Sequence, residues 1–192
     1  MNPPTVKSFP AAYKLIEKAT QEAGFSMASD PLTCALLSTL AASKPGGNFL
    51  ELGTGTGLAT AWILAGMDNA STLISLDNDP ACLAIAQQYL IADSRLNLIE
   101  ADGGEWLQTA VGQKFDYIFA DTWPGKYFFL DETLALLKPG GFYLIDDMLP
   151  QPNWPAGHDQ KAADLLAHLQ TRPDLRISQL DWATGVVVAV KQ

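Results

Sequence analysis

The chain has few basic residues, few cysteines and no long apolar run. It contains 12 lysines and arginines against 21 aspartates and glutamates, a formal net charge of −9, and the basic residues are scattered. Because nucleic-acid phosphates are bound by clustered lysine and arginine, this balance argues against a nucleic-acid partner. No apolar stretch approaches the length that spans a membrane, and no early segment has the form of a signal peptide. We therefore expect a soluble, cytoplasmic protein.

Cysteine and histidine are also scarce, with two of each. Cys34 and Cys82 fall in predicted helices among apolar neighbours, which predicts buried free thiols. His168 lies inside a predicted helix and is expected at the surface, whereas His158 opens that helix and is a secondary candidate for a base. The 192 residues, 48% hydrophobic and 17% charged, suffice for one domain with a full core.

The most informative stretch is residues 49–60, Phe-Leu-Glu-Leu-Gly-Thr-Gly-Thr-Gly-Leu-Ala-Thr. An apolar strand feeds glycines at alternate positions, Gly53, Gly55 and Gly57, and a helix-competent segment follows. Strand, glycine turn and helix form a main-chain pocket at the carboxyl end of a parallel strand, where open α/β sheets bind nucleotide-like ligands. The glycines permit positive φ and let a ligand approach the main chain closely.

The spacing of these glycines disfavours a dinucleotide. The G-x-G-x-x-G fingerprint requires a glycine where this chain has Leu58. Glu51, at the strand end, would repel a pyrophosphate but suits a cationic ligand such as an ammonium or a sulfonium. A nicotinamide oxidoreductase is therefore a minor alternative. The pattern E-x-G-x-G-x-G resembles the Rossmann-like class of S-adenosylmethionine (SAM) dependent methyltransferases, the class I enzymes.

Strands and helices alternate along the chain. Helices are predicted over residues 9–23, 31–43, 58–66, 80–92, 105–111, 128–137 and 159–171, and strands over 49–52, 72–76, 96–100, 117–120, 142–145, 175–180 and 186–191. The pairs Asp30-Pro31 and Asp79-Pro80 each provide an N-cap followed by proline in the first turn. This alternation predicts an α/β, doubly wound, mostly parallel sheet with helices on both faces, closed by a hairpin.

The resemblance adds detail to this architecture. It implies seven strands in the order 3-2-1-4-5-7-6, with the last strand antiparallel. We expect a single domain over residues 1–192, in which helices within residues 1–44 cover the cofactor and substrate site.

Acidic residues stand at or just past the ends of the five predicted parallel strands: Glu51, Asp77, Asp102, Asp121 and the pair Asp146-Asp147. Parallel strands bring their carboxyl ends to one edge of a sheet, so we expect these side chains to share that edge. Asp77 lies 24 residues beyond Gly53, the distance at which an acid accepts hydrogen bonds from ribose hydroxyls.

The resemblance implies further contacts with SAM. Glu51 would hold the methionine ammonium through water, and Asn78 would pack beside the adenosine. Asp102 and Gly103 would meet the adenine amino group, with a plain turn as the alternative. The implied cofactor-binding set is Met27, Ser29, Glu51, Gly53, Thr54, Gly55, Gly57, Asp77, Asn78, Asp102, Gly103 and Asp121.

Residues 115–121 and 140–147 resemble the catechol and caffeoyl-coenzyme A O-methyltransferases, which carry an aspartate after strand four and an Asp-Asn pair after strand five. Mg²⁺ and Ca²⁺ prefer oxygen ligands. The resemblance therefore implies a metal site at Asp121, Asp146 and Asp147. Asp147 stands where the family has asparagine, and this third carboxylate makes an empty site more costly. Alternatively, Asp121 serves SAM and substrate, and Asp146-Asp147 caps the following loop.

The lysine that acts as the base in that family is absent from the equivalent position of this chain. Three residues after Asp121, where the family has lysine, this chain has Pro124. Lys126 is then the candidate base, acting with Asp121, and the alternative is a solvated loop lysine. Trp123 matches a family tryptophan that walls the pocket beside the methyl donor. Trp154 is either a lid over an aromatic acceptor or a hydrophobic plug.

These features together predict SAM-dependent methyl transfer to a small hydroxylated acceptor, phenolic or catechol-like, assisted by a divalent cation. The alternatives are a methyltransferase directed at nitrogen or a carboxylate, and a SAM-binding protein without catalysis. An aminopropyltransferase of the spermidine synthase kind is less favoured, because its paired-acid signature is absent. The short amino-terminal extension implies a pocket that is open or is completed by the second subunit of a homodimer.

Overall fold

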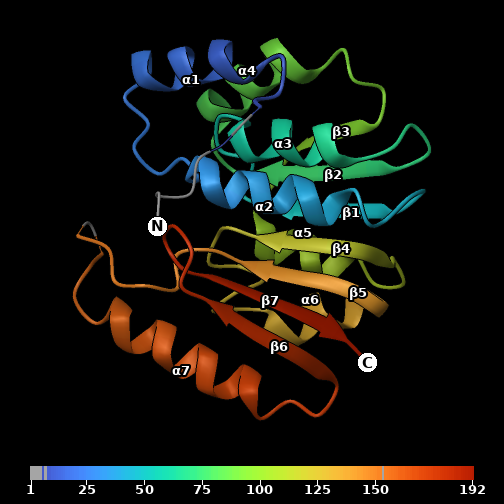
Figure 1. Ribbon diagram of the computed structural model, residues 1–192, viewed down its shortest axis with the longest axis vertical. Helices are drawn as coiled ribbons and strands as arrows, with labels where there is room; N and C mark the ends of the chain where they lie inside the picture. The colour runs from blue at the N-terminus through green and yellow to red at the C-terminus, as the bar shows by residue number, and fades with distance from the viewer. Residues whose placement is uncertain (1–5, 7, 153) are drawn as a thin grey trace.

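A central β-sheet organises the chain (Figure 1). In a computed structural model, which describes residues 6, 8–152 and 154–192, it has seven strands in the order β3-β2-β1-β4-β5-β7-β6. The strands are β1 (Asn48–Leu52), β2 (Thr72–Asp77), β3 (Leu96–Glu100), β4 (Phe115–Ala120), β5 (Leu137–Ile145), β6 (Leu175–Leu180) and β7 (Val186–Lys191). β1 to β5 pair in parallel, and β7 is antiparallel to both β5 and β6. The predicted strand order and antiparallel last strand are confirmed.

The start of β5 differs from the prediction. The sequence Lys-Pro-Gly-Gly at 138–141 predicts a turn before a short strand, but β5 already begins at Leu137. Its pairing with β4 moves from Phe115 opposite Leu137 to Tyr117 opposite Phe142, so residues 138–141 form an irregular bulge within the strand. A bulge of this kind accommodates proline and glycine, which a regular ladder does not.

The helices are α1 (Tyr13–Glu22), α2 (Pro31–Ala41), α3 (Leu58–Gly66), α4 (Pro80–Leu90), α5 (Gly103–Thr109), α6 (Leu130–Leu136) and α7 (His158–Gln170). Side-chain caps mark the start of α2, α4 and α5 among these seven helices of the described residues. Asp30 and Asp79 cap α2 and α4 through their carboxylates, and each cap is followed by proline, as predicted. None of the helices among the described residues combines the length and the apolar character needed to cross a membrane.

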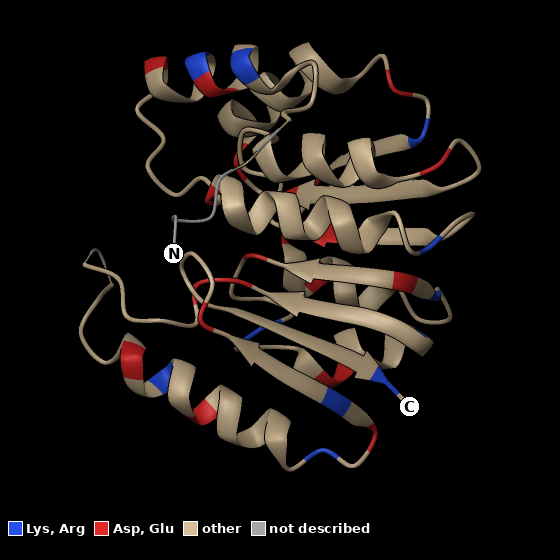
Figure 2. Cartoon of the chain, in the orientation of Figure 1, with Lys and Arg blue, Asp and Glu red and all other residues tan. Residues whose placement is uncertain are grey.

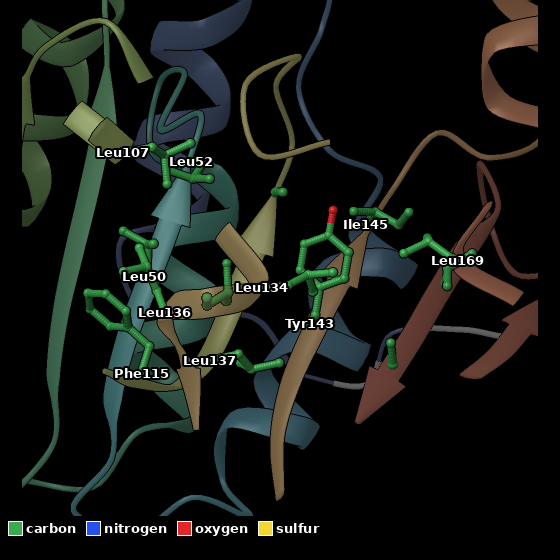
Figure 3. Close-up of a cluster of buried hydrophobic side chains, with 14 of the residues drawn as sticks. Leu50, Leu52, Leu107, Phe115, Leu134, Leu136, Leu137, Tyr143, Ile145 and Leu169 are labelled. Atoms are coloured by element: carbon green, nitrogen blue, oxygen red, sulfur yellow. The ribbon is translucent and has the colours of Figure 1, made fainter. Parts of the chain in front are cut away.

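Both faces of the sheet are covered, which explains the almost continuous apolar composition of its inner strands. On one face, residues such as Leu50, Leu52 and Tyr143 pack with α5, α6 and α7 (Figure 3). On the other face, Phe49 and Tyr117 pack with α1, α2 and α3. The two clusters alternate along each strand because successive side chains point to opposite faces. The carboxyl edge of the sheet is thereby held between two packed layers.

The contact between α2 and α3 is very close. Residues 58–64 of α3 are all buried, because the sheet lies on one side of the helix and α2 on the other. At the end of α3, a Cβ added to Gly66 would lie 2.1 Å from the main-chain oxygen of Ser38 on α2. Glycine at this position therefore lets the helices approach.

Gly66→Ala should destabilise the protein. Alanine normally stabilises a helical position by about 0.4–1 kcal/mol relative to glycine, but here the added methyl must push α2 away, at an expected net cost of about 1–3 kcal/mol. Urea unfolding measures the difference. The neighbouring exposed Ala65 offers the control, because Ala65→Gly should cost only about 0.5–1 kcal/mol. A Gly66→Ala variant more stable than the parent would contradict the close contact.

Candidate active site

The glycine loop between β1 and α3 has the predicted conformation. Gly53, Gly55 and Gly57 have φ angles of 99°, 51° and 92°, in the region that favours glycine. Two constraints disfavour a side chain at Gly57. Its φ is positive, and an added Cβ would lie 2.9 Å from Cβ of Ala86 on α4. The loop therefore keeps its main chain open at the carboxyl edge of the sheet.

Asp77, at the end of β2, lies beside this loop. Its Oδ2 accepts a hydrogen bond from the main-chain N–H of Gly55 at 2.7 Å, and its Oδ1 accepts one from Asp79 at 3.0 Å. Asn78 is exposed next to it. The structure thus brings Asp77 and Asn78 together with the glycine loop, as the sequence predicts.

These residues form one end of a cavity of about 570 Å³. The lining comes from the connector before α2, the glycine loop, the ends of β2, β4 and β5, and the segment that leads into α7. It comprises residues 25–30, 53–56, 58–59, 77–79, 82, 121–123, 126–127, 147, 151, 154–155, 158 and 184. Gln151 and Thr184 are members that the sequence did not single out, because neither belongs to a recognisable motif.

Glu51 does not line the cavity, contrary to the expected contact with an ammonium. Its side chain is fully buried, and its Oε2 accepts hydrogen bonds from Thr60 at 2.6 Å and Ser75 at 2.5 Å. Oε1 has no hydrogen-bond partner within the described part of the chain. Burial raises the pKa of Glu51 to about 7. This acid is buried behind the glycine loop and does not face a ligand in the cavity.

Asp102 and Gly103 are also outside the cavity lining. Asp102 is the N-cap of α5, with its Oδ1 accepting from the N–H groups of Gly104 at 2.8 Å and Glu105 at 3.0 Å. This cap starts α5 two residues before the predicted position. The turn at Asp102 and Gly103 is thus a helix N-cap outside the cavity lining, and its contact with adenine stays a prediction.

The amino-terminal region reaches the cavity through a connector. Residues 25–30 line it, whereas α1 and α2 pack against α3 and α4 and do not. Met27 is 72% exposed at the rim, and Ser29 Oγ donates a hydrogen bond to Asp121 Oδ2 at 2.9 Å. The covering expected of residues 1–44 therefore comes from this connector, with Met27 and Ser29 at the predicted place.

Acidic residues gather where β4 and β5 end (Figure 2). Asp121 and Asp147 line the cavity, but Asp146 is 1% exposed and its Oδ1 accepts from Thr184 Oγ1 at 2.6 Å and from the Asp147 N–H at 2.8 Å. Asp147 has a φ of 55°, which turns the chain between the two carboxylates. Among the residues that the structure describes, no three acidic, histidine or cysteine side chains are placed to hold a metal ion. The expected convergence of Asp121, Asp146 and Asp147 on one cation is not found.

Lys126 lies among these acids. It is 5% exposed, which contradicts a solvated loop lysine, and its Nζ donates to the main-chain oxygen of Asp146 at 2.5 Å. Burial lowers the pKa of Lys126, and the charges of Asp121, Asp147 and Asp146 oppose that shift. Burial and the two neighbouring carboxylates raise the pKa of Asp121 well above its usual range, and burial raises that of Asp146 to about 6.

The opposite wall of the cavity is aromatic. The ring of His158 lies 5.9 Å from Trp123, 5.2 Å from Tyr127 and 4.6 Å from Trp154, measured between ring centroids. Tyr127 Oη and His158 Nε2 are 3.1 Å apart. Burial lowers the pKa of His158 and raises that of Tyr127 to about 12, so both are neutral near pH 7. His158, a secondary candidate from sequence, is thus part of the site.

Sequence comparison places this geometry in a known family. A sequence model described as a methyltransferase domain matches residues 50–148, just over half of the chain. A protein of Mycobacterium avium, provisionally named an O-methyltransferase, is 32% identical over 120 residues, which are 60% of this chain and 54% of that protein. One from Mycobacteroides abscessus with the same provisional name is 32% identical over 138 residues, 68% of this chain and 64% of that protein. The chain spans a little over half the length of most of these relatives.

Solved structures share the whole fold. An O-methyltransferase from Bacillus cereus in complex with S-adenosylhomocysteine (SAH) has a TM-score of 0.82 at 18% identity, covering 98% of this chain and 92% of that one. An SAH-bound methyltransferase from Podospora anserina has a TM-score of 0.83 at 20% identity, covering 98% and 91%. At these identities the likeness concerns the fold. The sequence match and the sheet order together establish that this chain belongs to the methyltransferase domain family and has the class I, Rossmann-like fold of SAM-dependent methyltransferases.

Proposed function

We propose that this protein binds SAM and transfers its methyl group to the hydroxyl of a small aromatic acceptor. The observation that carries the proposal is that one cavity joins two kinds of wall. One wall has the glycine loop and Asp77, and the other has Trp123, Tyr127, Trp154 and His158. A nucleoside with a cationic sulfonium fits the first wall, and a flat apolar ring fits the second.

In the cofactor half, the residues suit a ribose and a positive charge. Asp77 is held by the Gly55 N–H and presents a carboxylate to ribose hydroxyls at the end of β2. Asp121 and Asp147 line the same cavity, and a sulfonium bound beside Asp121 would favour its charged form. Neighbouring folds crystallised with SAM or SAH support this assignment.

In the acceptor half, the side chains suit an aromatic ring. Trp123 and Trp154 offer ring faces on which an aromatic acceptor can pack at offset or edge-to-face geometry. Trp154 also contacts His158, so a ring packed on it lies near the imidazole. The provisional names of the curated relatives support oxygen as the acceptor atom.

When bound, SAM supplies an electrophilic sulfonium methyl. The protein then has two tasks, which are to align the acceptor oxygen with that methyl and to accept the hydroxyl proton. Alignment can contribute about 7–11 kcal/mol to lowering the barrier. We assign the proton to neutral His158 by way of Tyr127: the Tyr127 hydroxyl, 3.1 Å from Nε2, gives its proton to the imidazole and takes up the proton of the acceptor hydroxyl. The oxygen forms its new bond to the methyl carbon as the carbon–sulfur bond breaks, and SAH leaves.

Lys126 and Asp121, the base pair implied by the resemblance, are less suited to that role. The amine of Lys126 donates to the Asp146 carbonyl, and the Oδ2 of Asp121 accepts from Ser29. No step is assigned to a divalent cation, because Asp146 does not line the cavity and its Oδ1 is taken up by Thr184 and the Asp147 N–H.

SAH should bind with a stoichiometry of one, and Asp77→Asn should weaken binding. Loss of a charged hydrogen-bond acceptor costs about 1.5–3 kcal/mol, or roughly a 10- to 100-fold increase in Kd. Isothermal titration calorimetry measures both values. Glu100→Gln is the control, because Glu100 is an exposed acid at the end of the adjacent strand and does not line the cavity. Absence of SAH binding at millimolar concentration would overturn the proposed function.

Radiolabelled SAM should methylate a phenolic acceptor in preference to an amine or a carboxylic acid. We expect labelled product with catechol and none with fully O-methylated catechol, which keeps the ring but has no hydroxyl proton. Mass spectrometry identifies the methylated atom. Product formed only from the amine or the acid would contradict a phenolic acceptor and identify that other class as the substrate. SAH binding without any transfer would favour the non-catalytic SAM-binding alternative.

The pH dependence should identify the base. A base acts in its deprotonated form, so kcat/KM should rise with pH through the pKa of His158, which is lowered from the usual 6.5, and should be level by neutral pH. His158→Gln should lose about 10²–10⁴-fold in activity together with this rise. His168→Gln, a change of the exposed histidine on the same helix, should leave the profile unaltered. A rise at alkaline pH that persists in His158→Gln would assign the base to Lys126.

A further inference from the structure

We propose that Lys126 is a built-in cation that takes the place of the divalent ion implied by the catechol-type resemblance, so that this site works without a metal. Lys126 is the single lysine or arginine in the cavity lining, within the described part of the chain. It lies against the acidic ends of β4 and β5, where a cation would otherwise be expected. The role of Lys126 toward the acceptor rests on the proposed function. The argument that its charge replaces that of a metal ion does not.

The arrangement of the acids favours an ammonium over a metal ion. A divalent ion needs several oxygen ligands that converge on one point. Here Asp146 directs its carboxylate to Thr184 and leaves its main-chain oxygen to Lys126. Asp121 and Asp147 remain, and their charges already act on the buried amine. An incoming cation would have to displace the ammonium or bear its repulsion at short range.

The loop that carries Lys126 is held in place by hydrogen bonds and packing. Tyr143 Oη donates to the Gly125 carbonyl at 2.6 Å, and the Gly125 N–H donates to the Phe128 carbonyl at 2.6 Å. Gly125 has a φ of 84°, and an added Cβ there would lie 2.3 Å from Cδ1 of Leu52. These contacts pack the turn against β1 and β5 and direct Lys126 inward.

The substitution at Asp147 fits the same interpretation. The catechol-type resemblance has asparagine at this position, and aspartate adds a negative charge to the site. Three carboxylates without a cation would repel one another strongly in a buried setting. Lys126 offsets part of this charge. It stands two residues beyond Pro124, the position at which the family has its lysine.

The ammonium also has a direct task in positioning the acceptor. It has three N–H donors, and one of them is used on the Asp146 carbonyl. Because Lys126 also lines the cavity, a remaining donor can bind the acceptor oxygen and stabilise it as its proton leaves. Lys126 is then a cation that holds the acceptor oxygen, while His158 accepts the proton.

The decisive experiment is a Mn²⁺ titration followed by electron paramagnetic resonance, which does not depend on activity. The wild-type protein should not bind Mn²⁺ at roughly millimolar concentration. Lys126→Met removes the ammonium, leaves Asp121 and Asp147 in the cavity lining without a neighbouring cation, and should bind Mn²⁺ at least about tenfold more tightly. Lys191→Met is the matched control, because Lys191 also donates to a main-chain carbonyl, at 2.6 Å, but lies at the far end of β7. This control should behave as the wild type.

Two further variants keep the test informative if Lys126→Met does not fold. Lys126→Arg keeps the positive charge and should stay as unresponsive to Mn²⁺ as the wild type. Lys126→Met combined with Asp147→Asn lowers the repulsion, should be more stable in thermal unfolding than Lys126→Met, and should still bind Mn²⁺ more tightly than the wild type. Wild-type protein that binds Mn²⁺ at micromolar concentration would overturn the proposal, and so would a folded variant without Lys126 that ignores the ion.

Activity gives an independent readout. Wild-type transfer should be unchanged in EDTA, whereas Lys126→Met should lose activity and regain part of it with Mg²⁺. Wild-type transfer that EDTA abolishes would contradict the inference. Failure of the proposed function is distinguishable, because it removes methyl transfer and SAH binding but leaves the Mn²⁺ titrations as expected.

Discussion

The dominant constraint on this molecule is that a parallel sheet brings the ends of its strands, each with an acid, to a single edge. Carboxylates that are crowded and partly buried repel one another, and each must be hydrated, hydrogen-bonded or paired. Three of them are compensated by neutral donors. Asp77 is held by main-chain N–H groups, Asp102 caps α5, and Glu51 is buried against two hydroxyls. The remaining acids, at β4 and β5, are those that have a lysine among them.

The two halves of the cavity differ in the groups that donate hydrogen bonds to their acidic residues. Around the glycine loop, the main chain provides the donors, so this half depends on backbone conformation and tolerates few side chains at its glycines. Around β4 and β5, side chains from distant segments provide them, namely Ser29, Lys126 and Thr184. The geometry of the first half is therefore set by the main chain, and that of the second depends on individual side chains. The proposed roles in acceptor binding and charge compensation fall in this second half.

Much of the fold was predictable because its determinants are local. Apolar runs, glycine turns and Asp-Pro caps each act within a few residues, and they located the caps of α2 and α4 and the strands, apart from the start of β5. The site was predictable only in part. Strand ends locate the acids, but the direction of each carboxylate depends on distant partners. Asp146 turns to Thr184, which is 38 residues away, and Tyr127 meets His158, 31 residues away. No local pattern encodes either contact.

The proposed lysine in place of a divalent ion would change which acceptors the site can activate. A single positive charge, partly offset by three nearby carboxylates, lowers the pKa of a bound hydroxyl less than a doubly charged ion does. A neutral imidazole with a lowered pKa is likewise a weak base. Both features favour an acceptor whose hydroxyl is already acidic, such as a phenol with electron-withdrawing substituents, over an aliphatic alcohol. Under the proposed function, the aromatic wall and the modest proton-accepting groups therefore favour the same class of molecule.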